Sequence, residues 1–259
     1  MKTEKSVNFV GKIRKMWTLF RKEINFFFNS LIGYIVLAVF LLGTGLFLWV
    51  FPGQFNVMDM QQANLDALFI LAPWIFLFLV PAITMKTFAE EKRTGTIELL
   101  LTRPISDMTV VMAKFLASVT IVLMALLPTL IYFSTVYYLA EPTGNVDVAG
   151  TFGSFIGLFL LASVYSAIGV FASAMTDNQI VAFILAALLS FFFYMGFDAL
   201  GGLKMMSEIG NIIVSFGISE HYASMSRGVI DSRDVIYFLS AIALFLFLSR
   251  VKIQSRKWA

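Results

Sequence analysis

Charged and apolar residues are sharply separated along this chain. Six windows contain no Asp, Glu, Lys, Arg or His: 31–51, 67–85, 115–140, 148–176, 178–197 and 235–249. A helix needs about 20 apolar residues, at a rise of about 1.5 Å each, to cross the hydrocarbon core of a bilayer. Five windows reach or approach this length, and Arg250 and Lys252 at the end of the sixth can extend it by snorkelling.

This pattern predicts an all-α integral membrane protein with six transmembrane helices. The expected spans are about 31–51, 66–86, 110–140, 150–175, 178–199 and 234–250, within one membrane domain of residues 30–250. Residues 1–29 then form a cytoplasmic N-terminal segment, and 251–259 form a basic cytoplasmic tail. We expect no cleavable signal peptide, because the first apolar stretch is long enough to span and lacks a small-residue cleavage pattern.

Residues 9–29, ahead of the first span, carry apolar residues at spacings of three and four. Trp17, Phe20 and Phe27 belong to this stripe, and Arg21 and Glu23 fall between them. Such a stripe favours an amphipathic helix that lies in the membrane interface. The alternative is an N-terminal continuation of the first span.

Two kinds of feature interrupt the apolar pattern. Segment 209–219 is apolar but only 11 residues long, too short to span, and it favours an outer re-entrant or interfacial hairpin before the last span. Prolines lie inside the second and third spans, at Pro73, Pro81 and Pro128. They indicate kinks, which are either static or act as hinges.

In the fourth span, Gly153 and Gly157 form a G-x-x-x-G, which favours close helix packing.

The amino-acid composition mainly excludes classes of protein. Hydrophobic residues make up 59% of the 259 residues and charged residues 14%, against about 25% charged in a soluble domain. These values exclude a soluble enzyme and a disordered chain. The chain has no cysteine, which excludes disulfides and thiolate chemistry.

The distribution of basic residues predicts the orientation. Of the 19 Lys and Arg, 16 lie before the first span, between the second and third spans, or after the last. Only Lys204, Arg227 and Arg233 lie elsewhere, all within 198–234. The positive-inside rule then places both termini in the cytoplasm, with the chain in the inner membrane. The formal net charge of +3 reflects this topology, and we expect no nucleic-acid partner.

Sequence motifs give no sign of catalysis. The chain contains no G-x-x-x-x-G-K-[ST], no H-E-x-x-H and no G-x-S-x-G string. No ionisable side chain falls inside the six windows, which argues against an ion-coupled carrier, although backbone carbonyls can bind sodium. The single histidine, His221, is more typical of a hydrogen-bonded structural residue than of a catalyst. We therefore expect no enzyme activity and no metal or cofactor bound by this chain.

The most informative segment is the loop between the second and third spans, which reads EEKRTGTIELLLTRPIS over 90–106. Thr94 or Thr96 can cap a short helix there, and Pro104 ends it. Three apolar residues share one face of that helix: Ile97, Leu100 and Leu101. A short helix with an apolar ridge can dock in the groove of a partner. The alternative is a solvated loop whose leucines rest on the bilayer.

This loop resembles the signature of type-2 ABC transporter permeases. The resemblance covers Glu90 to Leu101, Arg103 to Ser106, and Lys114. Six spans, a preceding interfacial helix and an outer hairpin are similar to that architecture as well. Longer strings resemble the gliding-motility-associated permease subunits of Bacteroidota: LIGY from Leu31, GLFLWVF from Gly45, LAPW from Leu71, SAMTDNQIVAF from Ser173 and SRGVIDSRDVIYF from Ser226.

The resemblance implies a coupling helix near 94–103 that receives movement from a separate ATPase subunit. The residues it assigns to the coupling segment are Glu90, Glu91, Arg93, Gly95, Thr96, Ile97, Glu98, Leu100, Leu101, Arg103 and Pro104. The three glutamates would contact basic groups of the ATPase or brace the interfacial helix. The corresponding residues of the interfacial helix are Trp17, Phe20, Arg21, Glu23 and Phe27.

The resemblance also implies partners. These are an ABC ATPase subunit that binds ATP and Mg, a second permease body, and the lipid bilayer. The second body is either the same chain or a related subunit with a large periplasmic domain. The complex would couple ATP hydrolysis to translocation or mechanical work in gliding motility and associated secretion. Two other functions stay open: an ion-coupled secondary carrier, and a membrane scaffold that transports nothing.

Overall fold

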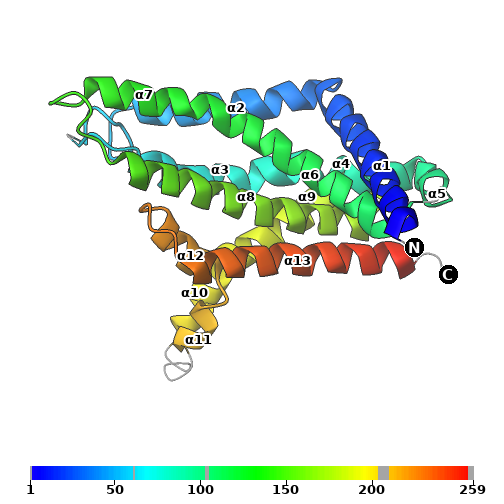
Figure 1. Cartoon of the computed structure of the whole chain (residues 1–259). Helices are drawn as coiled ribbons and strands as arrows, with labels where there is room; N and C mark the ends of the chain where they lie inside the picture. The colour runs from blue at the N-terminus through cyan, green and yellow to red at the C-terminus, as the bar shows by residue number, and fades with distance from the viewer. Residues whose placement is uncertain (1, 61, 103–104, 204–209, 256–259) are drawn as a thin grey trace.

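The computed structural model describes the backbone of residues 2–60, 62–102, 105–203 and 210–255, and the side chains of 13–60, 62–98, 102, 105–203 and 210–255. Within these ranges the protein is helical, without strands, and six helical stretches are long and apolar enough to cross a membrane. The predicted all-α fold with six spans is therefore confirmed. Successive spans run up and down along one bundle (Figure 1).

Some of the six spans are single helices and others are broken by short irregular turns. The single helices are α2 (Leu31–Trp49), α8 (Val148–Met175) and α13 (Ser232–Ser255). The second span combines α3 (Asp66–Thr84) and α4 (Lys86–Arg93), and a third helix, α5 (Thr96–Leu101), follows it. The third span runs through α6 (Asp107–Leu126), the 3₁₀ turn η1 (Leu127–Thr129) and α7 (Leu130–Leu139). The fifth runs through α9 (Gln179–Phe191), the π-helical turn η2 (Phe192–Gly196) and α10 (Phe197–Gly201).

Helix α8 is the centre of the bundle. Its most apolar stretch is 72% buried, against 28% for α2, 17% for the fifth span and 28% for α13. Helices α3, α6, α9 and α13 all pack against it. Small residues permit this crowding, since a Cβ at Gly169 would collide with Thr84 Oγ1 of α3. The central helix is thus built for close contact, while α2, α9 and α13 leave most of their surface free.

The G-x-x-x-G of α8 serves contacts within the chain. A Cβ at Gly153 would lie 2.5 Å from the carbonyl oxygen of Gly228, and one at Gly157 would lie 2.6 Å from Met225 Cβ. Both neighbours belong to helix α12 (Ile218–Met225) and the turn that follows it. The small residues therefore admit the backbone of this outer segment.

Helix α1 (Lys2–Phe28) precedes the bundle and crosses its end at an angle to the spans (Figure 1). It packs mainly against α6 and is separated from α2 by a turn at Asn29 and Ser30. The turn is tight, because a Cβ at Gly33 would lie 2.5 Å from the carbonyl oxygen of Phe27. Helix α1 is therefore a separate element and does not simply continue α2. It begins seven residues earlier than the predicted stripe, and its place in the membrane interface stays a prediction.

The segment before α13 forms two short helices, α11 (Gly210–Val214) and α12. Helices α10 and α11 project sideways from the bundle, and α12 returns to it (Figure 1). Tyr222 of α12 is buried and donates a hydrogen bond to the carbonyl oxygen of Phe69 in α3, over 2.7 Å. His221 Nδ1 lies 2.8 Å from Asp234 Oδ1 of α13. His221 is thus a hydrogen-bonded residue that ties α12 to the last span; the depth of this segment in a membrane stays a prediction.

Candidate functional site at the basic end of the bundle

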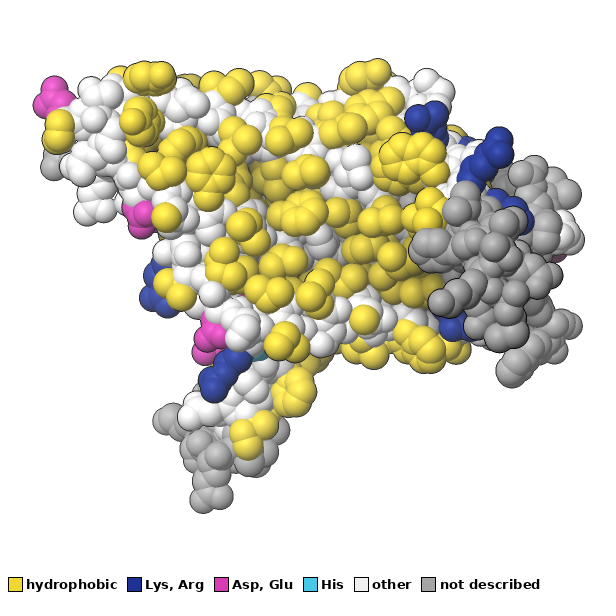
Figure 2. All heavy atoms as spheres, in the orientation of Figure 1, with side chains coloured by type: hydrophobic (Ala, Val, Ile, Leu, Met, Phe, Trp, Pro, Cys, Tyr) yellow, Lys and Arg dark blue, Asp and Glu magenta, His cyan; other side chains and the backbone are white. Residues whose placement is uncertain are grey.

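The start of α1, the end of α13 and α5 lie at one end of the bundle, here called the basic end (Figure 1). The basic residues described on the helices that meet there are Arg14, Lys15, Arg21, Lys22, Lys86, Lys92, Arg93, Lys114, Arg250 and Lys252. Figure 2 shows Lys and Arg side chains around this end and a broad apolar surface along the middle of the bundle. Charged side chains also appear at the opposite end, and an apolar middle between charged ends is typical of a bilayer-embedded body.

Helices α4 and α5 form a small helix–turn–helix at the basic end. Helix α4 ends at Arg93, and the hydroxyl of Thr94 donates to the carbonyl oxygen of Glu90 over 2.9 Å. Gly95 then adopts φ +70°, a left-handed conformation that glycine reaches without a Cβ clash. Helix α5 begins directly after it. The turn residues Thr94-Gly95 therefore reverse the chain between two short helices.

The predicted cap of this short helix is wrong. The residue before α5 is Gly95, and no side chain caps the first turn. The Thr94 hydroxyl binds the end of α4 instead, and it also lies 3.0 Å from the hydroxyl of Thr96. Because the chain reverses at a left-handed glycine, neither threonine is placed to accept from the first free amides of α5.

The predicted apolar ridge of α5 needs a second correction. Ile97 is 1% exposed and belongs to the hydrophobic core, so it does not stand on an exposed docking face. Burying such a side chain is worth about 1.5–3 kcal/mol, which favours contact with the bundle over exposure to water. Thr96 and Glu98 are exposed. The side chains of Leu100 and Leu101, and all of Arg103 and Pro104, lie outside the described residues, so their predicted role stays a prediction.

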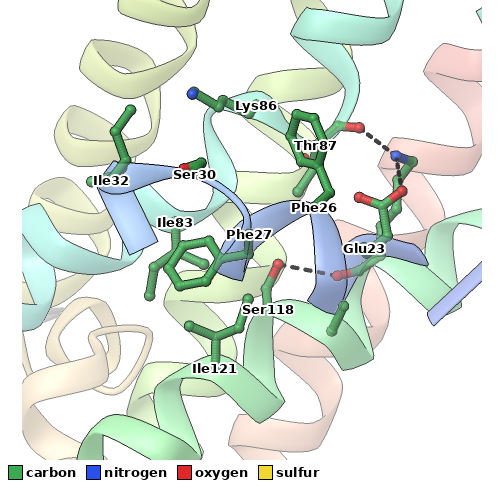
Figure 3. Close-up of a pocket in the computed structure, with 13 residues that line it drawn as sticks. Glu23, Phe26, Phe27, Ser30, Ile32, Ile83, Lys86, Thr87, Ser118 and Ile121 are labelled. Atoms are coloured by element: carbon green, nitrogen blue, oxygen red, sulfur yellow. Dashed lines mark hydrogen bonds and ion pairs between the residues drawn. The ribbon is translucent and has the colours of Figure 1, made fainter. Parts of the chain in front are cut away.

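A buried ion cluster joins three helices beneath this helix–turn–helix. Lys114 of α6, whose side chain is 3% exposed, donates to Glu23 Oε1 of α1 over 2.9 Å. It also donates to the carbonyl oxygen of Thr87 in α4 over 2.5 Å, and lies 3.1 Å from Glu91 Oε2. The second oxygen of Glu91 accepts from Lys22 of α1 over 3.1 Å. Figure 3 shows Glu23 and Thr87 converging on the ammonium group.

The charges of this cluster hold the helices in register. A buried ammonium is tolerated only where opposite charges and hydrogen-bond acceptors replace its water. Here the acceptors come from α1 and α4, while the ammonium comes from α6. A shift of any one helix would break at least one contact to a charge in a medium of low dielectric. The cluster therefore couples α1, α4 and α6 mechanically.

A second anchor fixes the start of α4 to α8. The hydroxyl of Ser173 accepts from the backbone amides of Phe88 and Ala89 over 3.0 and 3.1 Å, and donates to the carbonyl oxygen of Met85 over 2.9 Å. It thereby satisfies amides in the first turn of α4 that have no partner inside the helix. Lys92 at the other end of α4 donates to the carbonyl oxygen of Ala174. Helix α4 is thus clamped at both ends on the C-terminal turns of α8.

The remaining predicted residues lie around these anchors. Glu90 pairs with Arg93 over 3.1 Å on the surface of α4. On α1, Trp17 stacks on Phe20 with ring centroids 4.9 Å apart, and the Arg21 guanidinium lies 5.3 Å from the Trp17 ring centroid. Phe27 is buried at the turn into α2. Among the predicted residues, the structure brings Glu23 and Glu91 together, and it leaves Trp17 and Glu98 on the surface.

Sequence reasoning missed Thr87 and Ser173 as site residues and did not assign a role to Lys114. One signal for Lys114 was available, because it is a lone cation directly before a long uncharged window. Such a residue is either placed in water by the helix end or paired inside the protein. No comparable signal marks Thr87, which contributes its backbone carbonyl, or Ser173, one of several small polar residues in α8.

The fold and this site together define a multi-pass membrane protein with a braced helix–turn–helix at its basic end. Comparison with protein families places it further. The family model described as ABC-2 family transporter protein matches residues 17–251, and the chain belongs to this family. It is accordingly a membrane component of an ABC transporter and not itself an ATPase, with an ABC ATPase and the lipid bilayer as partners. No curated protein matches the chain.

Proposed function

We propose that this chain is the permease subunit that converts ATP hydrolysis by a separate ATPase into movement of the bundle, with α4, Thr94-Gly95 and α5 as the coupling element. The observation that carries this proposal is the buried Lys114 cluster, which ties α4 to α1 and α6. A force applied to α5 passes into α4, and α4 cannot move alone without breaking ion pairs. The motion is thereby delivered to α3, which directly precedes α4, and to α6.

The surface of the coupling element suits a charged partner. Arg93, Thr94, Thr96 and Glu98 are exposed around the turn at Gly95. Glu91 is largely buried and braces α1 through Lys22, so among the glutamates Glu98 is the one that meets the ATPase. ATP and Mg bind to that partner. Recognition of this kind uses charge at the rim to set orientation and encounter rate.

The basic end faces the cytoplasm in this proposal, and the chain lies in the inner membrane with both termini inside. The distribution of Lys and Arg along the chain supports this orientation. Helix α1 lies in the interface on that side: Trp17 is 51% exposed and Phe26 48%, while Arg21 and Lys22 are exposed beside them. An aromatic and basic face of this kind is typical of interfacial helices.

The machine in which this permease works is proposed from the sequence resemblance. Strings such as SAMTDNQIVAF from Ser173 support a place in gliding motility and the associated secretion, beside a second permease body. That body is the same chain or a subunit with a large periplasmic domain. The complex then couples ATP hydrolysis to translocation or to mechanical work.

Copurification of the ATPase tests the coupling element. Glu98→Arg reverses an exposed charge on α5, and Glu141→Arg is the matched control, because Glu141 is exposed in the loop between α7 and α8. We expect Glu98→Arg to reduce the ATPase recovered with the tagged full chain about tenfold, the cost of one charged contact. The control should retain it. Equal recovery with both variants would contradict docking at α5.

A further inference from the structure

A narrow cavity opens at the basic end where α1 turns into α2 (Figure 3). Polar side chains line it, among them Ser30, Lys86 and Thr87, together with apolar ones such as Ile32, Ile83 and Ile121. Its volume is about 30 Å³, room for no more than a few water molecules. A larger group would therefore sit at its mouth, beside Ser30 and Lys86.

Lys86 is the surplus cation of this cavity. Lys22, Arg93 and Lys114 each pair with a carboxylate, whereas Lys86 has no acidic partner in the part of the chain that the structure describes. Its side chain is half-buried, and it points away from the Glu23–Lys114 pair in Figure 3. A partly desolvated ammonium of this kind favours an anion that can accept its hydrogen bonds.

A wide apolar groove lies beside the cavity, between α2, α3 and α9. This groove has a volume of about 490 Å³, and the residues lining it include Ile35, Val39, Phe78 and Phe183. Ala82 lines both spaces. Phe78 and Ala82 lie one turn apart on α3, and Lys86 at the start of α4 lies one turn further along the same span, so these positions share one face. A cationic mouth and an apolar groove thus form a single stripe along the bundle.

We propose that this stripe binds an anionic glycerophospholipid of the bilayer, with its phosphate at Lys86 and Ser30 and one acyl chain in the groove. Lys86 is the first charged residue after the apolar α3, with Met85 between them, and Ser30 directly precedes α2, so both lie at the level where the apolar stretches end and headgroups begin. The other exposed cations at this end, among them Arg21 and Lys22, add attraction for an anionic lipid. A second protein body could cover the groove, but an apolar face would leave the Lys86 charge without an anion.

The proposal depends on membrane embedding and not on the ATPase, so it can fail while the coupling function stands. Its test is the lipid retained by the purified full chain, measured by native mass spectrometry after exchange into micelles with dioleoylphosphatidylglycerol or dioleoylphosphatidylcholine. Lys86→Gln removes the cation at the mouth. Lys252→Gln is the matched control, since Lys252 is an exposed cation near the end of α13 that does not line either space.

We expect the natural chain to retain phosphatidylglycerol about tenfold more tightly than phosphatidylcholine, as one charge-assisted contact provides. Lys86→Gln should abolish that preference and Lys252→Gln should keep it. Val39→Trp, which fills the groove from a position that is 57% exposed, should reduce retention of both lipids while the chain stays folded. Thermal unfolding of each variant verifies folding.

Three results would overturn the proposal. The first is an undiminished preference in Lys86→Gln, because the headgroup would then bind elsewhere. The second is stabilisation of the chain by inorganic phosphate as large as that by phosphatidylglycerol, which would indicate a site for the free anion. The third is a disulfide formed on mild oxidation between two copies of a Val39→Cys variant, together with an absence of retained lipid, which would assign the groove to a second copy.

Discussion

Different interactions stabilise the two ends of the bundle. At the basic end, a buried ammonium meets two carboxylates and a backbone carbonyl from neighbouring helices. At the opposite end, the segment that contains α12 meets the spans through hydrogen bonds of Tyr222 and His221 and through backbone packed on Gly153. Charge attraction in a buried site persists as the partners begin to separate, so it pulls the attached helices along, whereas close backbone packing leaves no room for displacement. The basic end is therefore suited to transmit a stroke, and the opposite end to hold a fixed frame.

Removing the buried cation should have the largest effect of any single change. Lys114→Met leaves the largely buried Glu23 without an ammonium and leaves Glu91 with only the exposed Lys22, which costs about 3–5 kcal/mol of unfolding free energy. Denaturant titration of the full chain in micelles measures this loss. A triple variant that also carries Glu23→Gln and Glu91→Gln removes the stranded charges and should recover most of it. A Lys114→Met chain as stable as the natural one would show that the cluster does not brace the helices.

Close packing at the opposite end predicts a second large effect. Gly228 has φ +84°, and a Cβ there would overlap the backbone of Gly150 in α8. Gly228→Ala should cost about 2–4 kcal/mol, from left-handed strain and overpacking together.

Gly95→Ala is the matched comparison for Gly228→Ala at the basic end. Gly95 has φ +70° and nothing within 4 Å of its hypothetical Cβ, so only about 1–2 kcal/mol of conformational strain remains. Unfolding titrations of both variants separate the cost of the left-handed conformation from the cost of overpacking. Equal losses would show that the contact between Gly228 and Gly150 adds nothing.

The sequence predicts the spans because burial in lipid excludes charge, and this exclusion is readable without any tertiary information. It does not predict the cluster in which Lys114 meets Glu23 and Glu91, because these residues lie 91 and 23 positions away from it along the chain. Helical periodicity also does not predict which surface the apolar face of a helix will contact. It correctly groups apolar positions on α5, yet Ile97 turns out to face the bundle and not a partner.

The cap of α5 was missed for a local reason. Threonine is a favourable N-cap by propensity, but a glycine with φ +70° changes which amides the Thr94 hydroxyl can reach. The six spans follow from where charged residues are absent along the chain, whereas the contacts of the site depend on how the helices pack. A short stretch of sequence shows whether it carries charge, but it does not show which distant residues it will contact.

The tie between α12 and α13 should respond moderately to mutation. His221 has both ring nitrogens engaged, Nδ1 with Asp234 and Nε2 with the carbonyl oxygen of Ser215 over 2.9 Å, and its ring stacks on Tyr237 at 3.9 Å. His221→Phe keeps a ring for stacking but deletes both polar contacts. We expect a loss of about 1–3 kcal/mol of unfolding free energy. Ser224 still donates to Asp234 in this variant, so a loss as large as that of Lys114→Met would contradict the contrast between the ends.

The smallest effect is expected inside the ion cluster itself. Lys22 pairs with the same Glu91 as Lys114 does, at the same distance of 3.1 Å, but its side chain is 57% exposed against 3% for Lys114. Water already solvates Lys22, so Lys22→Gln should cost less than about 1 kcal/mol. Added salt should shrink that cost further, because the pair is screened by solvent ions. A loss for Lys22→Gln comparable to that for Lys114→Met would mean that net charge near Glu91 matters more than burial. The mechanical coupling of α1 to α4 would then run through the surface pair and not through the buried ammonium.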